Sequence, residues 1–164
     1  MNKILTHPFK PIFDVNSRIL ILGTFPSVKS RENNFYYGHP QNRFWKVISA
    51  LTQTQLPVDV FEKIELLVKN KIAVWDVLRS CQIKGSSDIT IKNEIPNDLN
   101  SILKYSKIGA IFANGNTAYK LFLKHNKNKY NPSIICLPST SPANARFRLD
   151  ALINSWSALL VYLR

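Results

Sequence analysis

The chain alternates short apolar runs with amphipathic segments, an order that is typical of a mixed α/β protein. Residues 18–23 form a continuous apolar run rich in Ile and Leu, as expected of a parallel strand covered on both faces. Over residues 42–53 the apolar positions recur at helical spacing, which predicts an amphipathic helix. Further strands are predicted over 72–75, 108–112 and 133–137, and further helices over 57–70, 97–105, 116–125 and 149–163.

The repeating order of strands and helices predicts a three-layer α/β/α sandwich around a central, mostly parallel four-stranded sheet. The chain has 164 residues, enough to bury roughly two thirds of its unfolded surface in one core. No internal repeat or linker divides it, so we expect a single domain over 1–164. After Asp76 a polar loop is predicted to run through 84–88 to Pro96, long enough to have a function.

The charge balance favours a polyanionic partner. The chain carries 22 Lys and Arg against 10 Asp and Glu, for a formal net charge of +12. Its lysines are spread along the chain rather than gathered in one block, so a merely basic surface is the alternative interpretation. Neither Gly-x-x-x-x-Gly-Lys nor Gly-x-Gly-x-x-Gly follows a strand, which argues against an enzyme acting on small phosphate compounds.

The two cysteines, Cys81 and Cys136, are too few and too isolated for a zinc or iron–sulfur site. We expect both to be small buried side chains in a reducing compartment. Residues 1–10 lack the apolar core of a secretory signal, and the apolar runs at 19–22 and 158–163 are too short to span a membrane. The sequence therefore predicts a cytoplasmic protein without a membrane partner.

Small and polar residues follow each predicted strand. These clusters are 23–26, Asp76, 114–116 and 138–141. In open parallel sheets, ligands bind beyond the carboxyl ends of the strands, so the four clusters are candidates for one site. The alternative is that Gly, Pro, Ser and Asn simply form turns there.

Three of the segments resemble motifs of a known family. Residues 23–27 (Gly-Thr-Phe-Pro-Ser), 42–45 (Asn-Arg-Phe-Trp) and 137–142 (Leu-Pro-Ser-Thr-Ser-Pro) resemble the first motif, the following helix and the second motif of the uracil-DNA glycosylase superfamily. Within it the chain is most similar to the hypoxanthine-DNA (deoxyinosine) glycosylases, with the mismatch-specific uracil and thymine glycosylases as near relatives. The match covers nearly the whole chain. Iron–sulfur branches of the superfamily need four cysteines, which excludes them here.

The resemblance implies a monofunctional, monomeric DNA glycosylase with no metal or cofactor. Such an enzyme hydrolyses the bond between a deaminated base and its deoxyribose in DNA, with hypoxanthine preferred and uracil or xanthine as further substrates. Lyase activity is not expected, because no lysine stands in an apolar strand-end setting that would depress its pKa. The near alternative is a mismatch-specific uracil or thymine glycosylase. A non-catalytic nucleic-acid-binding domain is the alternative from another class.

The chain departs from the superfamily at two catalytic positions. Several relatives hold the attacking water with a carboxylate or amide in the first motif, where this chain has Phe25. The resembled family uses the Asn of the downstream helix, which maps onto Asn42. An amide is a weak base, so we expect Asn42 to hold water in position, or alternatively to cap the helix. Ser139 stands where relatives have His or Asn, and its hydroxyl can donate only one hydrogen bond to the leaving base.

The remaining candidates surround the base or contact DNA. The base pocket is predicted to comprise Gly23, Thr24, Phe25, Tyr37, His39 and Asn114. The wedge and phosphate contacts are predicted to comprise Ser27, Ser141, Pro142, Ala143, Asn144 and Arg146, with Arg148 nearby.

Several of these roles stay open at the level of sequence. Phe25 and one of Phe35, Tyr36 and Tyr37 are the candidates to stack on a flipped base. His39 could protonate a purine or be structural. Asn114 could read a base edge or form a turn, and the arginines could bind phosphate or simply be solvated. Asp76 and Asp88 could orient the loop backbone or the substrate.

Overall fold

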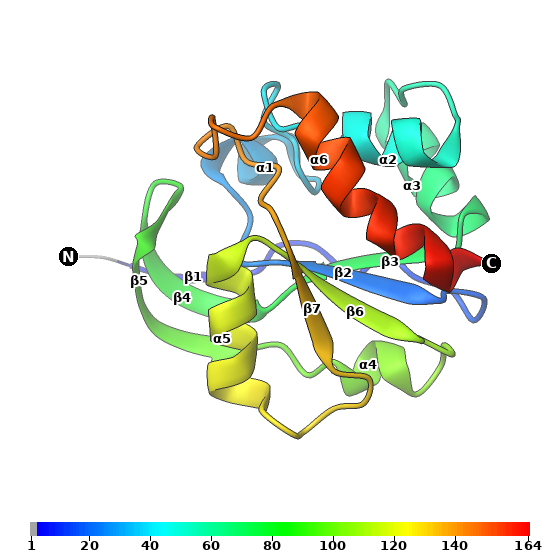
Figure 1. Cartoon of the computed structure of the whole chain (residues 1–164). Helices are drawn as coiled ribbons and strands as arrows, with labels where there is room; N and C mark the ends of the chain where they lie inside the picture. The colour runs from blue at the N-terminus through cyan, green and yellow to red at the C-terminus, as the bar shows by residue number, and fades with distance from the viewer. Residues whose placement is uncertain (1–2) are drawn as a thin grey trace.

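A computed structural model describes residues 3–164, and its main sheet has four parallel strands (Figure 1). The strands are β2 (Ile19–Gly23), β3 (Ile72–Asp76), β6 (Ala110–Asn114) and β7 (Ile134–Leu137), in the order β3-β2-β6-β7. Each neighbouring pair is parallel. All five residues of β2 are buried, because helices cover both faces of this central strand. The predicted parallel sheet is confirmed.

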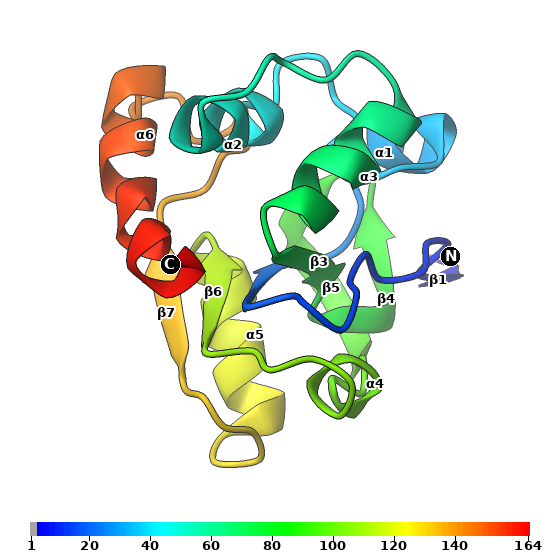
Figure 2. The ribbon, with the colours of Figure 1, turned by 90° about the vertical axis from the view of Figure 1, so that its right-hand side faces the viewer.

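Helices pack on both faces of this sheet, so the predicted three-layer architecture is also confirmed. One face carries α2 (Phe44–Thr52), α3 (Val60–Lys69) and α6 (Leu149–Trp156), and the other carries α4 (Asn100–Leu103) and α5 (Asn116–Asn126). Figure 2 shows α2 beside α6. Alternate residues of β2 enter two cores: Ile19 and Ile21 pack under α2 and α6, whereas Leu20 and Leu22 pack under α4 and α5.

The predicted polar loop after Asp76 is wrong. The segment forms an antiparallel hairpin of β4 (Leu78–Lys84) and β5 (Ser87–Pro96), which joins β1 (Ile4–Thr6) in a second sheet. Gly85 makes the turn at a φ of 57°, in the left-handed region. Every residue of β5 is exposed or half-buried, so the strand needs no apolar run and gives little strand signal.

Other boundaries also differ from the sequence prediction. A short helix, α1 (Val28–Asn33), was not predicted; the Ser27 hydroxyl caps it by accepting from Ser30 N–H. The predicted helix over 97–105 is the single turn α4. The last helix is α-helical only to Trp156 and continues as a 3-10 helix, η1 (Ser157–Leu163).

The two cysteines differ in their surroundings. Cys81 is fully buried, as predicted, and burial raises the pKa of its thiol to about 11. Cys136 is only half-buried, contrary to the prediction, and its thiol donates to Asn116 Oδ1. The difference arises because β7 is an edge strand. Separately, no helix among residues 3–164 is long and apolar enough to cross a membrane.

Shortening one buried side chain of β2 tests whether the strand packs against a core on both faces. We expect Leu20→Ala, which removes a fully buried side chain, to lower the free energy of unfolding by about 2–5 kcal/mol. Ile89→Ala serves as the control, because Ile89 is 94% exposed and its loss should change stability by less than about 0.5 kcal/mol. Urea denaturation measures both. Equal effects for the two variants would contradict the packing described above.

Candidate active site

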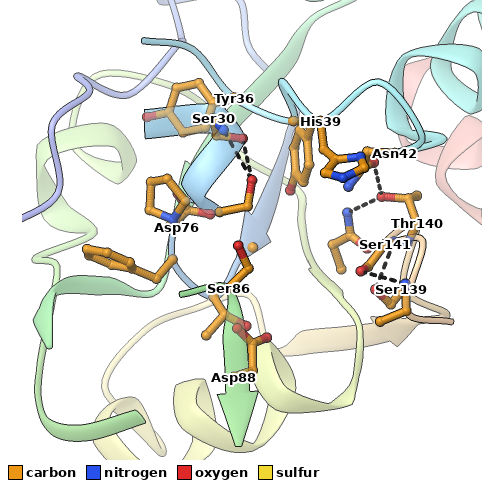
Figure 3. Close-up of a pocket in the computed structure, with 18 of the residues that line it drawn as sticks. Ser30, Tyr36, His39, Asn42, Asp76, Ser86, Asp88, Ser139, Thr140 and Ser141 are labelled. Carbon is orange, nitrogen blue, oxygen red and sulfur yellow. Dashed lines mark hydrogen bonds between the residues drawn. The ribbon is translucent and has the colours of Figure 1, made fainter. Parts of the chain in front are cut away.

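A pocket of about 310 Å³ lies beyond the carboxyl ends of β2, β3 and β6 (Figure 3). Its volume falls within the range of small-molecule sites. The three motif segments, far apart in sequence, meet at it. The predicted site residues that line the pocket are Gly23, Thr24, Phe25, Ser27, Tyr37, His39, Asn42, Asn114, Ser139, Ser141, Pro142 and Ala143.

An adjoining groove contains the two predicted site residues that the pocket lacks, Asn144 and Arg146. The groove runs past the start of α5 and the end of β7, between the hairpin and the loop that follows β7. Ser86, Asp88, Ser139, Ser141 and Ala143 line both the pocket and the groove. These residues therefore mark the boundary where the pocket opens into the groove.

Thr140 links the two predicted amides. Its hydroxyl donates to Asn42 Oδ1 at 2.9 Å and accepts from Asn114 Nδ2 at 3.0 Å, while its backbone N–H donates to Asn114 Oδ1 at 2.9 Å. Thr140 is fully buried. Sequence reasoning assigned it no role, because a threonine beside two serines in a turn gives no distinct signal.

The hydrogen bonds of Asn42 restrict what it can offer a ligand. Its Oδ1 accepts from the Thr140 hydroxyl and also from Phe44 N–H at 2.9 Å, so both lone pairs are used. The second bond ties Asn42 to the first residue of α2, but the N-cap position is Arg43, so Asn42 is not the N-cap residue considered from the sequence. The amide N–H group remains, and it can donate to an oxygen but cannot accept a proton.

The floor of the pocket requires the absence of a side chain at residue 23. A Cβ at Gly23 would overlap Asp76 Oδ1 and lie 3.0 Å from the Tyr37 hydroxyl. That hydroxyl is buried and makes no hydrogen bond within 3.5 Å in the described part of the chain, although the Asn114 side chain lies close enough to work against the rise of its pKa. Burial, with the negative charge of Asp76 adding to it, raises the pKa of Tyr37 well above its usual value. Tyr37 thus stays a neutral donor available to a ligand.

Asp76 is bound by His7, which lies in the segment directly after β1. Its Oδ2 lies 2.7 Å from His7 Nε2, and both side chains are buried. The Phe9 carbonyl lies 3.0 Å from His7 Nδ1, which fixes the ring. The pair leaves Asp76 Oδ1 at the floor beside Gly23.

Asp88 brings a second carboxylate to the pocket, from the tip of the hairpin. Burial raises its pKa to about 6; the Thr24 hydroxyl works against this rise and the charge of Asp76 adds to it. Two further hydrogen bonds fix the tip against α1. Arg31 Nη2 donates to the Gly85 carbonyl, and Val28 N–H donates to the Ser86 hydroxyl.

The structure distinguishes the aromatic candidates. Phe35 packs parallel to Trp45 with the ring centroids 6.1 Å apart and does not line the pocket. Tyr36 lines it, but its hydroxyl donates to the Lys10 carbonyl. Phe25 is 7% exposed and meets the His7 ring edge-on, and Tyr37 stacks on Phe44 at 4.0 Å. Phe25, Tyr36 and Tyr37 therefore remain the rings available to a ligand.

Arg43 holds the loop that follows β7. Its guanidinium donates to the backbone carbonyls of Ser141, Asn144 and Phe147. The Asn144 amide donates to the Ser139 carbonyl, so Asn144 braces this loop from within. Sequence reasoning missed the role of Arg43, because its partners are main-chain groups about a hundred residues away.

The other polar candidates already make some contacts or hydrogen bonds within the protein. Gly115, at a φ of 99°, brings the start of α5 against Ser139, since a Cβ there would lie 3.0 Å from Ser139 Cβ. The Ser139 hydroxyl accepts from Ser141 N–H and can still donate. His39 Nδ1 accepts from Gln41 N–H, which leaves Nε2 available at the pocket. Arg146 and Arg148 are both exposed.

Among residues 3–164, no group of three or more His, Cys, Asp or Glu side chains is arranged to hold a metal ion.

Comparison with known proteins agrees with the resemblance seen in the motifs. The sequence profile of the uracil DNA glycosylase superfamily matches residues 10–160, so the chain belongs to this superfamily. Two related proteins are both named hypoxanthine DNA glycosylase. The one from Methanosarcina barkeri is 39% identical over 97 residues, which are 58% of this chain and 61% of that protein. The one from Methanosarcina acetivorans is 34% identical over 155 residues, covering 92% of this chain and 95% of that protein.

A solved structure confirms the fold. The solution structure of a Methanosarcina acetivorans protein, provisionally named a uracil DNA glycosylase, superposes with a TM-score of 0.80 at 32% identity. The superposition covers 98% of this chain and 99% of that one. The three-layer fold is thus shared along nearly the whole length of both chains.

Removing the Thr140 hydroxyl tests the amide network. Thr140→Val keeps the shape of the side chain but leaves Asn42 and Asn114 each short of a partner, so we expect a loss of about 1–3 kcal/mol in the free energy of unfolding. The same change at exposed Thr6 should cost less than about 0.5 kcal/mol. Denaturant titration compares the two, and equal stabilities would show that the network does not stabilise the fold.

Proposed function

We propose that the protein is a DNA glycosylase that hydrolyses the N-glycosidic bond of deaminated bases, with hypoxanthine preferred and uracil or xanthine as further substrates. The observation that carries this proposal is the convergence of the three motif segments on one pocket beside a groove. Membership of the superfamily, the names of the two relatives and the net charge of +12 support it.

The shape of the site suits a flipped nucleotide. A base inside a duplex cannot be attacked, so the enzyme must extrude the nucleotide and fill the gap. We infer that the base enters the pocket while the strand lies in the groove. Pro142 stiffens the loop at the boundary, and Ser141, Pro142 and Ala143 are placed to fill the gap in the duplex. Arg146 lies in the groove, where a phosphate would pass.

Three donors in the pocket suit the leaving base. Bond cleavage leaves negative charge on the base, which donors fixed in advance can stabilise. The Tyr37 hydroxyl, the Asn42 amide N–H and the Ser139 hydroxyl are available for this purpose or to hold a water oxygen. We infer that Asn42 acts by position rather than as a base, because its carbonyl oxygen is already saturated.

We further infer a monofunctional enzyme that works as a monomer in the cytoplasm. No lysine lies among the described residues that line the pocket, so no amine is available there to form a covalent intermediate with the sugar. Both cysteines are free thiols, in keeping with a reducing compartment.

Incubation with modified duplexes tests the proposed activity. Oligonucleotides with a single inosine, uracil, xanthine or G·T mispair are treated with the protein, and abasic sites are then cleaved with alkali. We expect the fastest release from inosine, and intact strands until alkali is added. Release of uracil or mispaired thymine but not hypoxanthine would instead support a mismatch-specific enzyme. Binding of the duplexes without release of any base would support a non-catalytic DNA-binding domain.

Asn42→Ala tests the proposed catalytic amide. Losing a fixed donor should lower the single-turnover rate on inosine DNA by about 100-fold, because small losses of positioning have effects of that size. Gln41→Ala is the matched control, since Gln41 is the exposed neighbour outside the pocket. If folded Asn42→Ala protein cleaves at the wild-type rate, Asn42 has no catalytic role.

A further inference from the structure

The reaction needs an acceptor for the proton of the attacking water, and the first motif does not provide one. Phe25 has no polar side-chain atom, and Asn42 Oδ1 already accepts two hydrogen bonds. The acceptor must therefore come from elsewhere in the pocket. Among the described residues that line it, the carboxylates are Asp76 and Asp88.

The location of the sugar selects between these two carboxylates. If the base fills the pocket and the phosphates stay in the groove, the sugar that joins them must cross the boundary between the two spaces. Of the residues that line both spaces, three are serines and one is Ala143, and only Asp88 is ionisable. Asp76 lines the pocket but not the groove, and its Oδ2 is paired with His7 at the floor of the pocket.

The surroundings of Asp88 hold its carboxylate in place. The hairpin tip is fixed to α1 through Gly85 and Ser86, and the Thr24 hydroxyl faces the carboxylate. Thr24 is the residue directly before Phe25, so Asp88 reaches the edge of the first motif from a different strand. Figure 3 shows Asp88 on the opposite side of the pocket from Asn42 and Thr140.

We propose that Asp88 is the general base of the proposed glycosylase and takes over the task that the first motif leaves open. Its carboxylate accepts one proton from water while the water oxygen bonds to C1′ of the sugar. The C1′–N bond breaks, and its electron pair leaves with the base. The products are an abasic sugar that bears a C1′ hydroxyl, a protonated Asp88 and a base anion, which the donors across the pocket stabilise. The anionic carboxylate also stabilises the positive charge that develops on the sugar.

The electrostatic setting is consistent with this role. Burial and the charge of Asp76 raise the pKa of Asp88 to about 6, close to the value that favours a base near neutral pH. Bound DNA phosphates would raise it further. The other titratable or charged groups around it are Tyr36, Tyr37 and His39 in the pocket, Arg146 and Cys136 in the groove, Arg31 at the hairpin tip, and Cys81 and Lys84 on β4.

The test is the single-turnover rate of Asp88→Asn on inosine duplexes at saturating protein, from pH 5 to 9. This inference rests on the proposed function, so the wild-type rate is measured first. We expect the wild-type rate to rise with pH through a midpoint at or above about 6, and Asp88→Asn to be slower by about 100-fold or more and to lose this rise. Its affinity for the duplex should be unchanged or tighter, because a negative charge has been removed.

Glu94→Gln is the matched control. Glu94 lies on the same strand as Asp88 and its loss changes the charge equally, but it pairs with Lys124 and His125 away from the pocket. It should keep the wild-type rate and pH profile. Stability provides a second readout, because a carboxyl pKa raised from 3.8 to about 6 in the folded state lowers stability as the pH rises between these values, and the full cost is present above about 6. Folded Asp88→Asn should thus be at least as resistant to unfolding at pH 8 as the wild type.

The outcomes separate this inference from the proposed function. An active wild type and an Asp88→Asn variant with the same rate and pH profile would overturn the role of Asp88 alone. A weaker affinity at an unchanged rate would make Asp88 a binding group and would also overturn it. A wild-type protein that releases no base from any duplex would overturn the proposed function, and this inference with it.

Discussion

The Thr140 hydroxyl is the interaction on which the rest of the site depends. It joins Asn42 at the start of α2 to Asn114 at the end of β6, and Thr140 itself lies in the loop after β7. Three segments from distant parts of the sequence are thereby fixed relative to one another without solvent, since Thr140 is fully buried. Arg43, the next residue after Asn42, binds the carbonyls of the same loop, so the amide network and the loop form one rigid unit.

This unit gives the pocket two chemically different sides. Asn42 and Ser139 bring donors from the start of α2 and the loop after β7, whereas the carboxylates Asp76 and Asp88 come from β3 and the hairpin; the Tyr37 hydroxyl lies at the floor near Asp76. Hydrolysis of a glycosidic bond separates charge in the same sense, with positive charge on the sugar and negative charge on the base. A pocket that is polarised in advance favours that separation without reorganising, which is the usual source of electrostatic catalysis. The polarity can compensate for Phe25, which brings no polar side-chain atom to the first motif.

The sequence predicted those features that depend on a repeating pattern of apolar residues or on a general rule of the fold. The four parallel strands followed from their apolar runs, and the convergence of the motif segments followed from the rule that ligands bind at the carboxyl ends of strands. The hairpin was missed because no residue of β5 is fully buried, so its residues resemble those of a loop. Thr140 and Arg43 were missed because their roles depend on partners about a hundred residues away. Asp88 could be named from the sequence, but only the hairpin places it at the pocket boundary.

A crystal structure with a duplex that contains one central inosine would test the account most directly. The sugar of that nucleotide would carry a 2′-fluorine, which slows cleavage by destabilising positive charge at C1′. The account predicts that the hypoxanthine is everted into the pocket, within hydrogen-bond distance of the Asn42 or Tyr37 donors, with C1′ at the boundary facing Asp88. Hypoxanthine that stays stacked in the duplex, or that lies on another surface with the pocket empty, would contradict it.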